Sequence, residues 1–441
     1  MNMRILAILA AFLALPGRAF GFPPADAPEL ALRGPYAVGH SVLHFTDESR
    51  MEPSPQGTAP RRLDLLVWYP AQSEQGAGDD IRYCYPTPVT PGIDPASLPE
   101  EVCIAGLAAE GAAPVRGGNF PLLVVSHGFQ NSAAMLSWLG ESMASKGHVV
   151  AIIEHRDIPV INDATRQISF ATTVLNRSRD QRFVIARLRA AASDGESLLH
   201  DVLDPDRIAL AGYSMGGFGA VTTAGAGHDP DSMIMQAMPQ TMLAGLLEDD
   251  VLPPPEGLKA IILFAPWGYQ PPYSAWRREA LARIGLPILL IDGDHDDVSD
   301  YDRGVRPLWE SMTGAERWLL SFSEARHNIA VLDAPSPLAD HFAYRERFDE
   351  PVWRKDRLLA VNVHMITAFL ARTLGGDEDA ASAAMLDVPV EAAGEGSWPL
   401  ESGETAGAAY ARPDGASAGY WPGFHRRWAL GLRLEHRAAG E

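Results

Sequence analysis

The chain has 441 residues, and 46% of them are hydrophobic, which is enough for one large α/β domain or for one domain with additions. The formal net charge is −20 at pH 7, and no basic stripe is present that would neutralise phosphates, so we expect no nucleic-acid partner.

The N-terminus has the pattern of a secretory signal peptide. Arg4 supplies a positive charge, and residues 5–15 form an apolar run that is too short to span a bilayer. Small residues lead up to Gly21, so we expect residues 1–21 to be removed and the protein to be secreted or periplasmic. The alternative is a buried N-terminal helix. Residues 22–35 are rich in Pro and Ala and predict a disordered lead-in. No later stretch is a transmembrane candidate, so no integral membrane anchoring is expected.

Only Cys84 and Cys103 are present in the chain. Two cysteines in an exported protein predict one disulfide, and the alternative is a pair of free thiols. The segment between them is rich in proline, so we expect a long loop with little structure of its own.

Apolar, β-prone runs alternate with helical patterns between residues 36 and 374, the expected catalytic domain. The middle runs are apolar on both faces, as strands of a central parallel sheet are. This predicts an α/β fold, with a mostly parallel, twisted sheet and helices on both faces. The expected strands lie at 39–46, 62–69, 120–126, 148–154, 207–211, 259–264, 287–291 and 317–322, and helices at 131–146 and 180–192.

Two further segments look like additions to this pattern. Residues 228–257 contain four methionines and favour a lid or a wall of a substrate pocket, since Met adapts to flexible acyl chains; an ordinary core helix is the alternative. Residues 375–441 form a C-terminal extension rich in Ala, Gly and Glu, in which 429–436 predicts a late edge strand.

The string Gly212-Tyr213-Ser214-Met215-Gly216 follows a buried strand and precedes a helix of small residues. That context is typical of a nucleophile elbow, a tight turn in which glycines stand where any Cβ would clash. The turn raises the Ser hydroxyl above the sheet and points the next helix N-terminus at the reacting atom. Ser214 is therefore the candidate nucleophile; the alternative is a serine that only caps the helix.

A serine hydroxyl needs a base, and the base needs a carboxylate that holds its tautomer. His327 lies in a short loop after an expected strand and is the candidate base. The strand at 287–291 runs into an acidic turn, where Asp296 is the preferred acid and Asp294 and Asp297 are the alternatives.

Two backbone N–H groups are expected to form an oxyanion hole. One belongs to Met215 after the serine, and the other to Phe129 in the loop Ser126-His127-Gly128-Phe129. Aromatic residues near strand ends, Trp267, Tyr269 and Trp138, are candidates for a substrate pocket, with ordinary packing as the alternative.

Several short strings carry a resemblance to a known family. They are Val67-Trp68-Tyr69-Pro70, Ser126-His127-Gly128-Phe129, Ser137-Trp138-Leu139-Gly140-Glu141, Glu154-His155-Arg156-Asp157, Arg179-Asp180-Gln181-Arg182-Phe183-Val184 and the elbow itself. Over residues 36–370 the chain resembles the α/β-hydrolase superfamily, and within it the platelet-activating-factor-acetylhydrolase-like and predicted dienelactone-hydrolase-like branch. The resemblance implies the α/β-hydrolase fold and serine ester hydrolysis through an acyl-enzyme. It also suggests that the Glu154–Asp157 string is a salt-bridged structural loop.

These features predict a secreted carboxylesterase that requires no metal or cofactor and acts on a small-molecule or lipid ester. The closest alternative is a hydrolase of lipids or polyesters at an interface. A non-catalytic binding module and an acyltransferase are further alternatives from other classes. The sequence does not predict the oligomeric state.

Overall fold

The computed structural model describes residues 23–54, 57–72, 81–90, 92–238, 252–395, 421–425 and 427–441. The expected signal peptide and residues 239–251 of the methionine-rich segment lie outside these ranges. Among the described residues, no helix is both long enough and apolar enough to cross a membrane.

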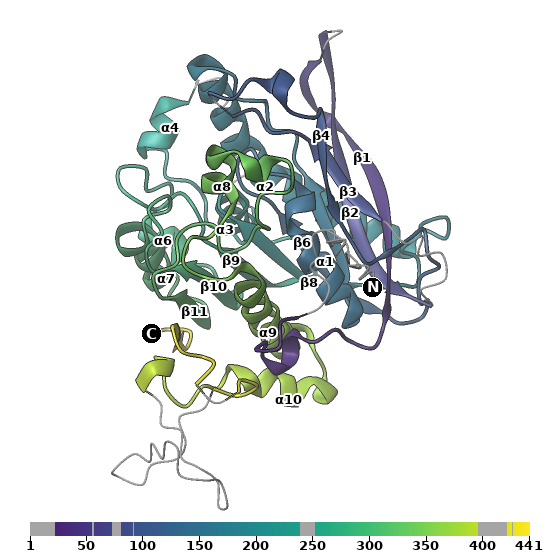
Figure 1. Ribbon diagram of the computed structural model, residues 1–441, viewed down its shortest axis with the longest axis vertical. Helices are drawn as coiled ribbons and strands as arrows, with labels where there is room; N and C mark the ends of the chain where they lie inside the picture. The colour runs from purple at the N-terminus through teal and green to yellow at the C-terminus, as the bar shows by residue number, and fades with distance from the viewer. Residues whose placement is uncertain are drawn as a thin grey trace, which may run out of the picture.

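A ten-stranded sheet forms the centre of the molecule (Figure 1). Its order is β12-β11-β10-β9-β8-β6-β7-β2-β1-β5, and the strands from β11 to β7 are parallel to one another. The strands are β1 (Ala37–Ser54), β2 (Gly57–Ala71), β5 (Ala109–Glu110), β6 (Phe120–Ser126), β7 (Val149–Glu154), β8 (Leu203–Tyr213), β9 (Leu258–Phe264), β10 (Ile288–Gly293), β11 (Arg317–Phe322) and β12 (Leu432–Arg437).

Helices cover both faces of this sheet. Helices α1 and α9 pack with one buried cluster, and α2, α3 and α7 pack with the other. The expected mostly parallel sheet with helices on both faces is therefore confirmed. The helices are α1 (Ser137–Ser145), α2 (Asp163–Ser193), α3 (Met215–Thr223), α4 (Met233–Ala237), α6 (Arg278–Leu281), α7 (Arg306–Ser311), α8 (Phe342–Phe348), α9 (Lys355–Leu374) and α10 (Ala380–Ala383). Short 3-10 turns are η1 (Glu29–Ala31), η2 (Pro95–Ser97), η3 (Ala133–Leu136), η5 (Leu338–Asp340), η6 (Asp377–Asp379), η7 (Ala384–Leu386) and η8 (Ala393–Glu395), and η4 (Tyr301–Val305) is a π-helical turn.

The strand order changes direction beside β6, and this change places the site. The chain passes from β6 to β7 on one side and then to β8 on the other. Ligands of open α/β sheets bind at such a switch point, outside the carboxyl ends of the strands. The register puts Ser126 at the end of β6 directly beside Gly212 near the end of β8. The loop after β6 and the turn after β8 are therefore neighbours.

Residues 23–35 are ordered, so the prediction of a disordered lead-in is wrong for them. The Leu30 N–H donates to Nδ1 of His364 on α9 at 3.2 Å, and Ala31 is buried. Figure 1 shows this N-terminal turn next to α9. The composition predicts disorder because ordering a chain costs conformational entropy. Burial of the alanines of this segment in the core cluster of α9 offsets that cost. At the other end of the chain, β12 pairs antiparallel with β11 at the sheet edge, which confirms the expected late edge strand.

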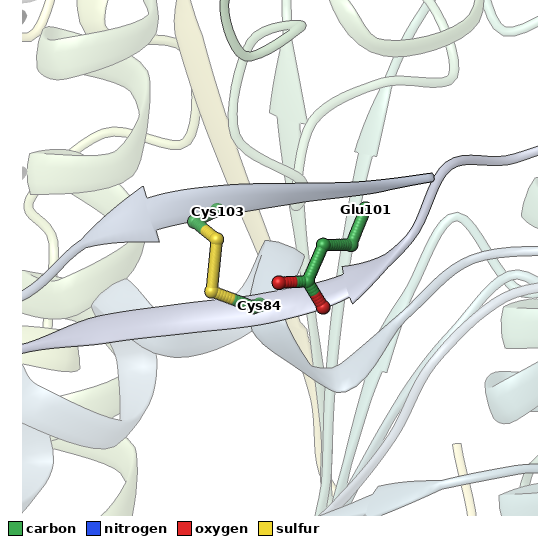
Figure 2. A group of neighbouring side chains, drawn as sticks. All are labelled: Cys84, Glu101 and Cys103. Carbon is green, nitrogen blue, oxygen red and sulfur yellow. A yellow bond between two sulfur atoms is a disulfide. The ribbon is translucent and has the colours of Figure 1, made fainter. Parts of the chain in front are cut away.

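The disulfide is present and joins two strands rather than two points of a loop. Cys84 on β3 (Arg82–Pro86) and Cys103 on β4 (Glu101–Ala105) are opposite each other in a two-stranded antiparallel sheet (Figure 2). Glu101 points toward the same spot, so its carboxylate lies within 4.8 Å of the two sulfurs. Because both sulfurs are bonded to each other, only one ligand atom remains there, and a metal site is not formed.

Candidate active site

The turn after β8 has the geometry of a nucleophile elbow. Ser214 stands between β8 and α3 with φ 53° and ψ −114°, a strained conformation for a residue with a side chain. A Cβ on Gly212 would lie 2.3 Å from the carbonyl carbon of Gly216, and one on Gly216 would lie 2.0 Å from the Ser126 carbonyl oxygen. Both glycines are therefore required by close backbone approach, as the sequence pattern predicts.

Ser214, His327 and Asp296 form a continuous hydrogen-bonded chain. The Ser214 Oγ lies 3.1 Å from Nε2 of His327, and Nδ1 of His327 lies 2.7 Å from Oδ2 of Asp296. Ser214 is 8% exposed, and Asp296 is 4% exposed. The hydroxyl thus faces a ring nitrogen that is able to accept its proton, while the carboxylate holds the other nitrogen protonated.

The Asp296 carboxylate is fixed from behind by the backbone. Its Oδ1 accepts the N–H groups of Val298 at 2.7 Å and Ser299 at 3.0 Å. Burial acts to raise the pKa of Asp296, but the interaction with His327 and these two N–H groups outweigh it. The pKa of Asp296 therefore lies below its ordinary value, and the group is ionised at neutral pH.

The two alternative acids are occupied elsewhere. Asp294 accepts the N–H of Glu324 at 2.6 Å and bonds to His295, while Asp297 pairs with Arg326. Neither hydrogen-bonds to His327. Of the carboxylates in the acidic turn, Asp296 is the one that the structure brings to the histidine.

The loop after β6 lies against the nucleophile. A Cβ on Gly128 would be 3.2 Å from the Ser214 Cβ, so only glycine permits this approach without a shift. Met215 is the first residue of α3, and its N–H has no acceptor within the helix. The N–H of Phe129 belongs to the peptide that follows Gly128. Both candidate oxyanion donors therefore lie directly beside Ser214.

A buried arginine orients the Gly128–Phe129 peptide. The Gly128 carbonyl accepts from Nη2 of Arg177 at 3.1 Å and from Nδ1 of His127 at 2.7 Å. Because the C=O and N–H of a trans peptide unit point in opposite directions, these bonds aim the Phe129 N–H away from Arg177. Arg177 also holds Asp157 through two contacts of 2.7 Å. The sequence reasoning missed Arg177, although the Glu-His-Arg-Asp string contains its partner Asp157.

A second buried group of charged and polar side chains, centred on Asp180, lies beside the loop after β6. Asp180 accepts from Arg61 at 2.6 and 2.8 Å and from Nδ1 of His155 at 2.8 Å. Nε2 of His155 accepts from the Ser126 hydroxyl at 2.7 Å, at the end of β6. The contacts of His155 and Asp157 agree with the interpretation of their string as a salt-bridged structural loop.

An aromatic strip frames Ser214. Ring centroids are 6.0 Å apart from Phe129 to Phe170, 5.2 Å from Phe170 to Trp267, and 5.0 Å from Trp267 to Tyr273. The backbone N–H of Trp267 donates to the Ser214 carbonyl at 3.2 Å, so the strip, which starts at Phe129, passes beside the nucleophile. Tyr273 at its other end is 37% exposed. The strip offers a partly buried apolar surface for a substrate.

The three aromatic pocket candidates differ in their positions. Trp267 belongs to the strip, while the hydroxyl of Tyr269 lies 3.3 Å from Ser311 Oγ on α7. The choice of Trp138 as a pocket residue is wrong. Trp138 is 1% exposed in the core beside α9 and donates its indole N–H to the Ala330 carbonyl at 2.8 Å, so it supports the loop after His327 from below.

The methionine-rich segment is described in part. Met235 and Met238 are buried in the core, and Met233 on α4 is 52% exposed. Met242 lies outside the described residues. The described part thus agrees with the alternative of core packing and leaves the lid as a prediction.

Comparisons with known proteins agree with this geometry. Residues 113–244, less than half of the chain, match a family model described as PET hydrolase-like. This range contains Phe129 and Ser214 but stops before Asp296 and His327. The chain has the α/β-hydrolase fold.

Curated relatives are cutinases of the genus Thermobifida. The chain is 25% identical to Cutinase 2 of Thermobifida cellulosilytica and 24% identical to Cutinase est1 of Thermobifida alba, over 48% of this chain in both cases. It is also 25% identical to Cutinase cut1 of Thermobifida fusca, over 48% of this chain. The matches span 63%, 55% and 51% of these relatives' own lengths. Together with the family model, these relatives indicate that the chain is similar to serine esterases of the α/β-hydrolase fold.

Proposed function

We propose that the protein is a serine hydrolase of carboxylic esters and that Ser214, His327 and Asp296 are its catalytic triad. The observation that carries the proposal is the hydrogen-bonded chain of these three side chains at a strained elbow beside two candidate oxyanion donors. The family model and the cutinase relatives support the same reaction class.

The proposed reaction follows from the positions of the atoms. The Ser214 Oγ attacks the ester carbonyl while Nε2 of His327 takes its proton. The N–H groups of Phe129 and Met215 stabilise the oxyanion, and each such donor is typically worth about 3 kcal/mol. His327 then gives the proton to the leaving alcohol. A water molecule, activated by His327, hydrolyses the acyl-enzyme and restores the serine.

We further propose polyesters as the substrate class. Cutinases and PET hydrolases are named for polyester substrates, and the aromatic strip from Phe129 to Tyr273 provides an apolar track that leads away from Ser214. Secretion is part of this proposal, because a polymer is reached only outside the cell. Membership of the platelet-activating-factor-acetylhydrolase-like branch is a finer proposal that rests on the short strings alone.

Hydrolysis of p-nitrophenyl esters from acetate to palmitate tests the reaction class. Ser214→Ala is expected to lower kcat by at least about 10⁴-fold. Ser323→Ala, a change in an exposed serine near the end of β11, is the matched control and is expected to keep wild-type rates. Hydrolysis that survives Ser214→Ala would contradict the proposal.

Release of soluble acid from a solid polyester film tests the substrate class. Wild-type enzyme is expected to release product in proportion to film area, and Ser214→Ala to release none. Activity restricted to phospholipid or triglyceride emulsions would instead favour the lipid hydrolase. Transfer of the acyl group to added alcohols in preference to water would favour the acyltransferase.

A further inference from the structure

Arg347 on α8 lies at the junction of the two loops that form the candidate active site. The side-chain amide of Asn328, which follows His327, donates to the carbonyls of Glu346 at 3.2 Å and Asp349 at 3.0 Å. The end of α8 is thereby tied to the histidine loop. On the other side, Nη2 of Arg347 donates to the carbonyl of Gln130, which follows Phe129. The guanidinium thus borders the oxyanion loop.

This guanidinium has no carboxylate partner among the described residues. Two other arginines do have carboxylate partners. Arg345 on the same helix pairs with Asp349, and Arg326, next to His327 in sequence, pairs with Asp297. The titratable groups that face Arg347 are the phenols of Tyr344 on α8, Tyr85 on β3 and Tyr213 at the elbow. The guanidinium also lies 5.4 Å from the centre of the Phe348 ring. A largely buried cation is therefore surrounded by aromatic and carbonyl groups.

A partly desolvated cation without a carboxylate partner lowers the stability of the folded protein. The chain carries 56 acidic against 36 basic residues, so carboxylates for pairing are abundant elsewhere on it. Only one of the five N–H groups of the Arg347 fork has an acceptor among the described residues. The planar fork matches a carboxylate in geometry and charge. The missing partner is thus of the kind that a bound ligand supplies.

We propose that Arg347 binds a carboxylate of the substrate, so that the site selects esters that carry a free carboxylate at some distance from the scissile bond. Half-esters of dicarboxylic acids and carboxylate-ended polyester fragments are such substrates. The position beside Gln130, rather than beside the Ser214 Oγ, assigns Arg347 to a distal group of the substrate and not to the reacting carbonyl. This proposal rests on the proposed function of Ser214.

Matched substrates test it. Monomethyl adipate and monomethyl terephthalate carry the carboxylate, and the corresponding monoamides have nearly the same shape without the charge. For wild-type enzyme, kcat/KM is expected to be about 10- to 100-fold higher for the acids, the range of a charged hydrogen bond. Arg347→Gln is expected to remove this preference by raising KM for the acids, with less than about 3-fold change for the amides. Arg347→Lys is expected to keep part of it.

Arg345→Gln, on the exposed face of the same helix, is the matched control and is expected to keep the preference. An equal loss for acids and amides in Arg347→Gln would overturn the proposal, because it would show that Arg347 only supports the oxyanion loop through Gln130. Absence of any preference in the wild-type enzyme would also overturn it.

A second measurement needs no variant. Adipate and terephthalate are expected to inhibit hydrolysis of p-nitrophenyl acetate competitively, and their diamides are expected not to; equal inhibition by both would overturn the proposal. Failure of the proposed function is distinguishable from these outcomes, since it would appear as hydrolysis of p-nitrophenyl acetate that survives Ser214→Ala.

Discussion

Two carboxyl groups share the buried space behind His327. Asp292 ends the apolar part of β10, is fully buried, and has an Oδ2 atom without a hydrogen-bond donor among the described residues. Burial and the neighbouring Asp296 carboxylate raise the pKa of Asp292 well above its ordinary value, whereas that of Asp296 is lowered. Asp296 is therefore the member of the pair that ionises first as the pH rises, and Asp292 keeps its proton to a higher pH.

We predict that Asp292→Asn is more stable than the wild type at pH 8 and equally active. The pKa of Asp292 is higher in the folded than in the unfolded state, so this acid favours the unfolded state increasingly as the pH rises above its unfolded value near 4. A neutral amide removes that dependence. Thermal unfolding at pH 5 and pH 8 checks the prediction: the gain in Tm should grow with pH. Asp294→Asn, an exchange in the same turn, is the control, and a lower Tm for Asp292→Asn at pH 8 would contradict the interpretation.

Arg177 supports the loop that carries the Phe129 N–H, so a substitution of Arg177 is expected to affect catalysis. Arg177→Lys retains a charge for Asp157 but loses the fork that also reaches the Gly128 carbonyl. We expect kcat to fall roughly 10- to 100-fold with little change in KM, because the Phe129 N–H is needed mainly in the transition state. Steady-state kinetics on one p-nitrophenyl ester measures this split.

Arg182→Lys is the matched control for Arg177→Lys. Arg182 lies on the same helix and also donates to backbone carbonyls, but these belong to Pro253, Leu252 and Thr223, away from the site. The kcat of Arg182→Lys is expected to stay near the wild-type value. An unchanged kcat in Arg177→Lys would show that the Gly128 peptide needs no such support.

At the residue scale, the sequence predicted the three side chains of the candidate triad, but not the neighbouring groups that fix their positions. The elbow glycines and the strand-end position of His327 follow from local pattern. The separation of Asp296 from Asp294 and Asp297 depends on Glu324 and Arg326, which come from a loop about 30 residues later. Arg347 was missed because its partner is the backbone carbonyl of Gln130, which no sequence pattern marks. Arg177 pairs with Asp157, but its second contact, to the backbone carbonyl of Gly128, is not marked by any sequence pattern either.

Three elements, β1, β2 and α2, are longer than the sequence predicts. In each of them, backbone hydrogen bonding or a helix cap extends the element beyond its apolar residues. β1 and β2 extend to Ser54 and Gly57, beyond the apolar runs, because the antiparallel ladder continues through polar residues. Helix α2 starts at Asp163 rather than near residue 180, since Asn162 and Thr165 form a capping box there. Its first half is polar and rich in Thr, which hides it from a search for apolar periodicity.

The β3–β4 hairpin gives a prediction at this scale. Its disulfide closes a segment with a sequence separation of 19, and in the chain-entropy model such a closure is worth about 3 kcal/mol. The hairpin is also held by Tyr83, whose hydroxyl accepts from Trp68 and donates to Glu141 at 2.8 Å each. We expect Cys84→Ser/Cys103→Ser to fold with a Tm lower by several degrees and with wild-type kcat, because these contacts remain.

Thermal melts with and without reductant check the hairpin prediction. Reductant is expected to lower the Tm of the wild type toward that of the double variant and to leave the variant unchanged. Identical melting of wild type and variant without reductant would contradict a stabilising role of the disulfide.

For the whole molecule, buried neutral histidines set the response to acid. His40, His155 and His364 are 5%, 3% and 0% exposed, and burial lowers their pKa values to about 4, 3 and 3. The unfolded chain takes up these protons below about pH 6.5, whereas the folded protein does not. The free energy of unfolding therefore falls as the pH drops below 6.5, by up to about 1.4 kcal/mol per pH unit for each histidine.

Urea unfolding between pH 7.5 and 4.5 measures this slope. Buried carboxylates with a lowered pKa, such as Asp157 at about 2, act only below about pH 4. The raised pKa values of Asp292 and Glu141 act in the opposite direction to the histidines, so the share of one histidine is read from the difference in slope between its variant and the wild type. His364→Gln is expected to reduce the slope by about one histidine's share, and His44→Gln, a change in an exposed histidine, to leave it unchanged. The same slope in His364→Gln and in the wild type would refute the prediction.

The most direct test of the central claim is covalent labelling of the folded protein with a fluorophosphonate, read by intact mass and peptide mapping. A serine activated by His327 is expected to give one adduct, on the peptide that contains Ser214. Ser214→Ala should remain unlabelled, and His327→Gln should react at least about 100-fold more slowly. A wild-type protein that stays unlabelled, or that is labelled at another serine, would contradict the proposed nucleophile.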